Sequence, residues 1–301
     1  MNKIFKKKNY LIVGVAIFAI GFLFGPFTVK AATTVYLDLG KSVIYEGDIF
    51  LINLKISTPD KSINVIDGTL IYDRDKLEIK EASVGGSLFQ LWPKPPVFSN
   101  EKGALSFVGG APNGFQGEGE ILKIIFLAKK EGKTQIDFQD CFSVFLNDGK
   151  GTSVNPWLKS LSLDISKRPP EIPAKDEWQI LIENDKNPPE SFEIIISKDL
   201  NIFNNQYFIS FFTTDKESGI DRYEIQEGAG SYVIGDSPYL LKDQKLRSTI
   251  KVKAIDKAGN EKVAELATTV WFWFWLALIL AIILVLIFVK IIKTAVKKKN
   301  I

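Results

Sequence analysis

Residues 50–56 read FLINLKI, and apolar side chains stand at every second position. Successive side chains of a strand point to opposite faces, so the four apolar residues share one face of an extended strand. The same alternation recurs at residues 35–39 and 161–165. Strands with one apolar face must bury that face against another layer, which predicts a β-sandwich in this part of the chain.

The segment from residue 33 to residue 165 reads as short strands separated by turn residues every eight to twelve positions. Gly, Asp and Asn cluster in the connections, where they favour tight reversals and positive φ. We therefore predict an all-β domain over residues 32–166 with nine strands. The expected strands are residues 35–39, 50–56, 63–72, 76–84, 104–108, 120–128, 134–138, 142–146 and 161–165, and the expected reversals are residues 46–48, 73–75, 100–103, 112–114 and 147–149.

Five motifs occur in a fixed order along this domain. They are YEGDIF at 45–50, DGTLIYD at 67–73 leading to Leu77-Glu78, GALSF at 103–107, GFQGEG at 114–119, and LKIIF at 122–126 with Gly132. In this order they resemble the bacterial cohesin module. The resemblance implies a nine-stranded jelly-roll sandwich, related in fold to cellulose-binding modules, that docks dockerin modules through one sheet face. The implied partner is a dockerin-like protein module or a polysaccharide.

One segment of the domain is unusually rich in aromatic residues and prolines. Phe89, Trp92 and Phe98 stand close to three prolines within ten residues, and Phe115 stands among glycines. Exposed aromatic rings beside prolines would form a rigid platform for a sugar ring or a partner side chain. The alternative is a hydrophobic lid folded over the edge of the sandwich. These four aromatic residues are the candidate binding residues.

A second domain is predicted after the composition break RPPEIP at residues 168–173, which favours an extended connector over residues 167–176. Strands are expected at residues 192–197, 206–214, 220–226, 231–234 and 249–255. The segments FFTTDKESGIDRYE at 211–224, SPY at 237–239 and VKAIDKAGN at 252–260 resemble bacterial immunoglobulin-like or fibronectin type III-like surface modules. The resemblance implies a second β-sandwich over residues 177–267 that acts as a spacer.

Residues 270–289 read VWFWFWLALILAIILVLIFV and carry no charge. A helix of this length spans roughly 30 Å, the thickness of the hydrocarbon core of a bilayer. Trp271, Trp273 and Trp275 stand at its N-terminal end, and Lys290 and Lys293 follow it. Interfacial tryptophans and cytoplasmic lysines are typical of membrane anchors. We therefore predict one transmembrane helix over residues 270–289 and a basic cytoplasmic tail over residues 290–301, which would also touch anionic lipid.

The N-terminal residues 1–31 have the pattern of a secretory signal peptide. Four lysines precede an apolar stretch at residues 10–24, and Val29-Lys30-Ala31 predicts cleavage after Ala31. The alternative is an uncleaved first span. In both cases residues 32–269 are expected outside the cell. Ten of the 38 basic residues lie in the two terminal segments, so the exported part holds 28 basic and 35 acidic residues. Its net charge is therefore −7, which argues against binding the phosphates of a nucleic acid.

The chain has no histidine and one cysteine, Cys141. These counts exclude histidine-based catalytic and zinc sites and an intrachain disulfide, and Cys141 is expected to be a small buried side chain in a strand. We predict a membrane-anchored surface binding protein that is not an enzyme and needs no cofactor. The alternatives are a structural envelope protein and a glycosidase that uses two carboxylates.

Calcium is the one cation that the acidic residues suggest, because its preferred ligands are oxygen atoms. In the first domain the candidates are Asp73 with Asp75 and Asn147 with Asp148. In the second domain they are Asp215, Glu217, Asp221 and Asp256. No segment has the ligand spacing of an EF-hand loop, and solvated turn residues are the competing interpretation, so no metal site is assigned.

Overall fold

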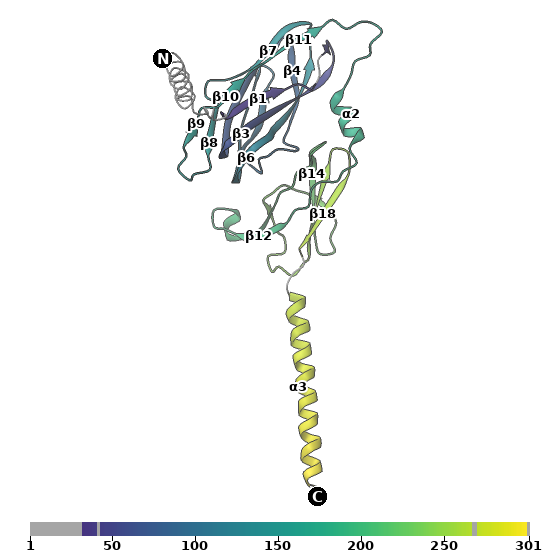
Figure 1. Cartoon of the computed structure of the whole chain (residues 1–301). Helices are drawn as coiled ribbons and strands as arrows, with labels where there is room; N and C mark the ends of the chain where they lie inside the picture. The colour runs from purple at the N-terminus through teal and green to yellow at the C-terminus, as the bar shows by residue number, and fades with distance from the viewer. Residues whose placement is uncertain (1–31, 41–42, 267–269, 300–301) are drawn as a thin grey trace, which may run out of the picture.

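The structure, a computed structural model, describes residues 32–40, 43–266 and 270–299. At residues 270–274 and 291–299 it describes the backbone alone. The predicted signal peptide, residues 1–31, lies outside the described residues. Figure 1 shows two β domains one above the other, with a short helix at their junction and a long helix that leads away from the second domain. The chain is mostly β, as the sequence predicted.

The first domain, which we call the distal domain because it lies farther from the C-terminal helix (Figure 1), contains eleven strands. They are β1 (Thr34–Asp38), β2 (Ile44–Tyr45), β3 (Ile49–Tyr72), β4 (Leu77–Ser83), β5 (Leu91–Ser99), β6 (Ala104–Ala128), β7 (Gly132–Phe138), β8 (Ser143–Leu146), β9 (Ser153–Val154), β10 (Trp157–Lys159) and β11 (Leu161–Ser166). All nine predicted strand segments are confirmed. Strands β2, β5, β9 and β10 were not predicted.

Two long strands, β3 and β6, pair antiparallel and organise the domain. Each joins two strands that the sequence predicted separately, so the reversal expected at residues 112–114 is wrong. Register shifts between Thr58 and Val65 divide their ladder into two parts. Strands β1 and β4 pair with the part that contains the start of β3 and the end of β6. Strands β5, β7 and β8 pair with the part that contains the end of β3 and the start of β6.

The core of the distal domain is continuous and apolar. Alternate residues of β3, including Phe50, Ile52 and Leu54, are buried, and Phe107 and Phe126 of β6 meet them in the same cluster. Burying each such side chain stabilises the fold by about 1.5–3 kcal/mol. Cys141 is exposed in a turn, which corrects the prediction of a buried strand position.

The second, proximal domain is a smaller sandwich of two sheets. A three-stranded sheet has the order β12–β13–β16 and a four-stranded sheet has the order β15–β14–β17–β18. Ile209, Ile225 and Val252 pack between them. Strands β16 and β18 were not predicted. The bounds are β12 (Ile194–Lys198), the 3₁₀ turn η1 (Phe203–Asn205), β13 (Tyr207–Phe211), β14 (Ile220–Glu227), β15 (Val233–Ile234), β16 (Tyr239–Leu240), β17 (Ile250–Asp256) and β18 (Glu261–Leu266).

A helix that the sequence analysis missed, α2 (Glu177–Asn184), stands between the two domains. Asp176 caps its N-terminus, because the Asp176 carboxylate accepts a hydrogen bond of 2.8 Å from the backbone N–H of Gln179. The pair Asp176 and Gln179 is a capping signal that the sequence does contain. Trp178 of this helix is buried.

The predicted connector is tied to the distal domain. Arg168 forms an ion pair of 2.8 Å with Asp48, and the backbone N–H of Lys175 donates to the same carboxylate. Burial alone would raise the pKa of Asp48, but the hydrogen bonds from Arg168 and from backbone N–H groups hold that pKa below its usual value. The connector therefore packs against the domain that precedes it.

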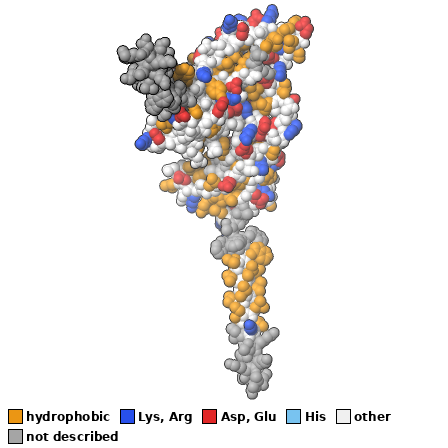
Figure 2. All heavy atoms as spheres, in the orientation of Figure 1, with side chains coloured by type: hydrophobic (Ala, Val, Ile, Leu, Met, Phe, Trp, Pro, Cys, Tyr) orange, Lys and Arg blue, Asp and Glu red, His pale blue; other side chains and the backbone are white. Residues whose placement is uncertain are grey.

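The long C-terminal helix is α3 (Val270–Lys299). It includes the whole predicted segment 270–289, and Figure 2 shows an apolar surface over its described part. Among the residues that the structure describes, no helix has the length and hydropathy needed to cross a membrane. Transmembrane insertion of residues 270–289 therefore stays a prediction.

Candidate functional site

One of the solvent-facing sheet surfaces of the distal domain carries exposed aliphatic side chains. It is formed by β5, by the first part of β6, by the second part of β3 and by β8. The register places Lys94 opposite Val108 and Val108 opposite Asp67, while Val97, Ser106 and Thr69 form the next row. Directly paired residues project from the same side of a sheet. We call this surface, with Leu91 and Ile71 at its ends, the open face.

The open face combines exposed aliphatic side chains with a few polar groups. Leu91 is 55% exposed, Val97 58% and Ile71 43%. Asp67 and Lys94 are exposed among them. Isolated surface aliphatics are ordinary, but a cluster on a flat sheet surface is typical of interaction sites. The opposite side of the same strands carries Ile66, Leu70 and Phe107 into the core, so the surface is rigidly supported.

The four aromatic residues that the sequence singled out do not form one common site. Phe89 is 1% exposed and lies in the core, while Trp92, Phe98 and Phe115 are partly buried and pack against it. Phe89 meets Trp92 edge to face, with ring centroids 5.9 Å apart. This arrangement agrees with the hydrophobic lid rather than with an exposed platform of four rings. Trp92 also reaches the space between the two domains.

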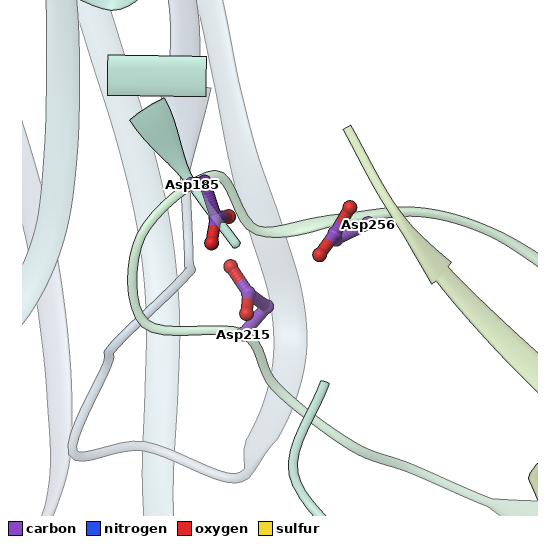
Figure 3. Close-up of side chains that lie close together, drawn as sticks. All are labelled: Asp185, Asp215 and Asp256. Atoms are coloured by element: carbon purple, nitrogen blue, oxygen red, sulfur yellow. The ribbon is translucent and has the colours of Figure 1, made fainter. Parts of the chain in front are cut away.

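A cluster of three carboxylates lies in the proximal domain, next to the junction. Asp185 follows α2, Asp215 follows β13, and Asp256 ends β17, and one carboxylate oxygen from each lies within 4.8 Å of the others. Figure 3 shows the carboxylates of Asp185 and Asp215 pointing toward each other, with Asp256 beside them. The three residues are between 1% and 3% exposed.

Hydrogen bonds from the backbone hold this cluster. Asp215 Oδ1 accepts from the N–H groups of Ser218 and Gly219, at 2.9 Å each. Asp256 accepts from both the backbone and the side-chain amide of Asn260. No ion pair between described residues includes any of the three carboxylates. Burial raises the pKa of Asp215, and repulsion from Asp185 and Asp256 adds to the increase.

The cluster shows that two of the calcium candidates in the second domain were interpreted wrongly as solvated turn residues. Asp215 and Asp256 are buried and close together, so they are not solvated turn residues. Asp185, which completes the cluster, was missed because it stands outside the segments with a recognisable pattern. Three carboxylates supply the hard oxygen donors that calcium accepts.

The other calcium candidates do not join a cluster. Asp221 pairs with Arg222 at 2.7 Å, and Glu217 accepts a hydrogen bond from Asn187. In the distal domain, Asp73 accepts from the backbone N–H of Asp75, and Asp148 accepts from that of Lys150. These are hydrogen bonds of ordinary turns.

The predicted anchor residues are only partly described. Trp275 and Lys290 are described on α3, and Trp275 is exposed. The side chains of Trp271, Trp273 and Lys293 lie outside the described residues.

Comparisons with known proteins found similarity at the level of solved structures. A non-cellulosomal cohesin from Archaeoglobus fulgidus is 19% identical, and the match covers 46% of this chain and 93% of that one with a TM-score of 0.39. A type I cohesin–dockerin complex from Clostridium thermocellum matches at 17% identity over 48% of this chain and 99% of that one, with a TM-score of 0.39.

A cohesin module of a family 33 glycoside hydrolase from Clostridium perfringens is 16% identical, over 46% of this chain and 100% of that one, with a TM-score of 0.37. These similar solved structures are cohesin modules. No protein-family model matches the chain, and no curated protein matches it.

Proposed function

We propose that this protein is a surface binding protein whose distal domain docks a dockerin-like protein module through the open face. The observation that carries the proposal is the open face itself, a sheet surface supported by the core, with exposed aliphatic residues and a few charges. Exposed aliphatic residues interspersed with polar groups on one surface are typical of interaction sites. The cohesin-like motifs of the sequence support the same partner.

The cluster of three carboxylates does not have the arrangement of a glycosidase site. A glycosidase needs two accessible carboxylates on either side of a sugar. Within the described part of the chain, the cluster of three carboxylates is buried, and its oxygen atoms are hydrogen-bonded to backbone amides. A substrate cannot reach these groups without unfolding the loops around them. The open face also exposes aliphatic rather than aromatic residues at Leu91, Val97 and Ile71, which favours a protein partner there.

We further propose that residues 270–289 anchor the chain in a membrane, with residues 32–269 outside. The proximal domain then acts as a spacer between the open face and the membrane. Tethering confines a bound partner near the surface and raises its effective concentration, so a modest affinity is sufficient. Protease added to intact cells should remove the two β domains and leave an epitope fused after Ile301 intact. Loss of that epitope would contradict this orientation.

Binding of purified dockerin modules to the full chain in mild detergent tests the docking proposal. Val97→Asp places a charge at an exposed position of the open face and should weaken binding at least tenfold, measured by biolayer interferometry. Ile234→Asp is the matched control, because Ile234 is also an exposed aliphatic residue of a strand but lies on the proximal domain. Equal affinities of the two variants, or no binding by any dockerin module, would refute the proposal.

A further inference from the structure

The two β domains enclose a groove that the sequence did not indicate. Its volume is about 560 Å³, within the range of sites that bind small molecules. The distal domain contributes the end of β4 together with Trp92, Pro95 and Pro96. The proximal domain contributes Phe212 and Arg222 among other residues. The exposed aliphatic residues of the open face, Leu91, Val97 and Ile71, do not line the groove.

A second hollow of about 500 Å³ is lined by Gln90 of the distal domain and by Glu193 and Ile195 of the proximal domain, among other residues. The two hollows share residues 211–214 and Ser237. Phe212 is 44% exposed, and in the described parts of the two domains it shares the exposed class of aromatic residues with Trp157 alone. Phe212 lines both hollows, so a linear chain that occupied both would pass this exposed ring.

The groove is held in one shape by contacts between its two walls. Glu81 of β4 accepts a hydrogen bond of 3.0 Å from the indole N–H of Trp178 and forms an ion pair with Lys257. Lys123 donates to the carbonyl oxygens of Gly85, at 3.0 Å, and of Lys216. A preformed site loses little conformational entropy when it binds.

The charged residues that line the two hollows indicate which class of ligand the groove can bind. Five acidic residues and two basic residues line the two hollows, namely Glu81, Glu190, Glu193, Asp221 and Asp236 against Arg222 and Lys257. This surplus repels polyanions. Carboxylates and the Arg222 guanidinium are suited to hydroxyl groups, which donate and accept hydrogen bonds. A ligand rich in hydroxyl groups can add hydrogen bonds to these groups, whereas an apolar peptide cannot.

We propose that this groove binds a neutral polysaccharide, with a sugar ring stacked on Phe212 and hydroxyl groups bonded to the polar residues on either side. Flat apolar rings contact aromatic faces at little conformational cost. The site is separate from the docking surface, so one chain holds a protein partner on its distal domain and a glycan at the junction. The groove thereby links the protein to a carbohydrate matrix.

Isothermal titration of the full chain in mild detergent tests this proposal. The probes are three neutral hexasaccharides, cellohexaose, xylohexaose and N-acetylchitohexaose, and one anionic hexasaccharide, hexagalacturonate. At least one neutral probe should bind, and hexagalacturonate should not. Phe212→Ala should weaken the binding at least tenfold, whereas Phe212→Tyr keeps the ring and should bind within about twofold of the native chain.

Two further variants make the test specific. Asp236→Ala, at an exposed position on the groove, should weaken glycan binding several-fold without lowering the melting temperature. Val97→Asp, on the open face, should leave glycan binding unchanged, which separates this proposal from the docking proposal. The groove proposal is overturned if no neutral hexasaccharide binds, if Phe212→Ala binds as well as the native chain, or if hexagalacturonate binds most tightly.

Discussion

Replacing Asp215 by asparagine should stabilise the proximal domain at neutral pH when divalent cations are absent. The three carboxylate oxygens of the cluster lie within 4.8 Å of one another. Two charges at that separation repel each other by about 3 kcal/mol at an effective dielectric constant of about 20. Asparagine retains Oδ1, which can accept the hydrogen bonds from Ser218 and Gly219, and it offers an N–H₂ donor in place of the second oxygen.

The pH dependence of this effect follows from the raised pKa of Asp215. The folded chain holds the Asp215 proton more tightly than the unfolded chain does. The free energy of unfolding therefore falls as pH rises from the unfolded pKa through the folded pKa, and the full penalty is present at neutral pH. The asparagine variant lacks this penalty, so its advantage should be present at pH 7 and should shrink toward pH 4.

Thermal unfolding of the full chain in mild detergent with EDTA measures the effect. A gain of roughly 1–3 kcal/mol should raise the melting temperature by several degrees at pH 7. Asp221→Asn is the control, because Asp221 is exposed and its pairing with Arg222 contributes little. A lower melting temperature for Asp215→Asn would refute the reasoning. Calcium chloride in place of EDTA tests the alternative, since a bound cation would raise the melting temperature of the native chain and remove the advantage of the variant.

Three further substitutions test the junction, the helix cap and the core. Gly85→Ala adds a Cβ only 2.7 Å from the backbone carbonyl oxygen of Asp215, so it should push the two domains apart. Hydrogen exchange of the backbone amides at the junction should then become faster. Unchanged exchange would contradict the close approach of the two segments. Asp176→Ala should destabilise α2 by about 1 kcal/mol, visible as faster exchange of its amides, while Asp176→Ser retains a cap and should not. Phe107→Ala should cost about 3–5 kcal/mol in chemical denaturation, and a loss below 1 kcal/mol would show that Phe107 is not at the centre of the core.

Periodicity predicted the strands well because it reports local burial. Alternating apolar residues located the strands at residues 35–39, 50–56 and 161–165, and short apolar runs between turn residues located the other six predicted segments of the distal domain. Strand β5 was missed because its prolines and irregular pattern suggest a loop, whereas the strand pairs with β6 through a ladder with two register shifts. Residues 112–114 read as a turn, but β6 passes through them with Gly114 at positive φ. Local turn chemistry could not show that both flanking segments pair with one partner strand.

The residues at the junction of the two domains could not be found from the sequence. Asp185, Asp215 and Asp256 are separated by thirty and forty-one positions, and none occurs in a segment with the ligand spacing of a known cation-binding loop. The ion pair between Glu81 and Lys257 joins the two domains across 176 positions. Single-sequence patterns carry no information about such tertiary contacts, so the groove and the cluster become visible in the structure alone.

The cluster of three carboxylates and the junction are mechanically connected. The segment that carries Asp215 also carries Lys216, whose carbonyl oxygen accepts a hydrogen bond from Lys123 of the distal domain. Asp256 precedes Lys257, which pairs with Glu81, and burial lowers the pKa of Lys257 to about 8. Asp185 ends the helix that carries Trp178. Repulsion within the cluster therefore acts on all three segments that contact the distal domain. We expect a group that neutralises this repulsion to strengthen these contacts.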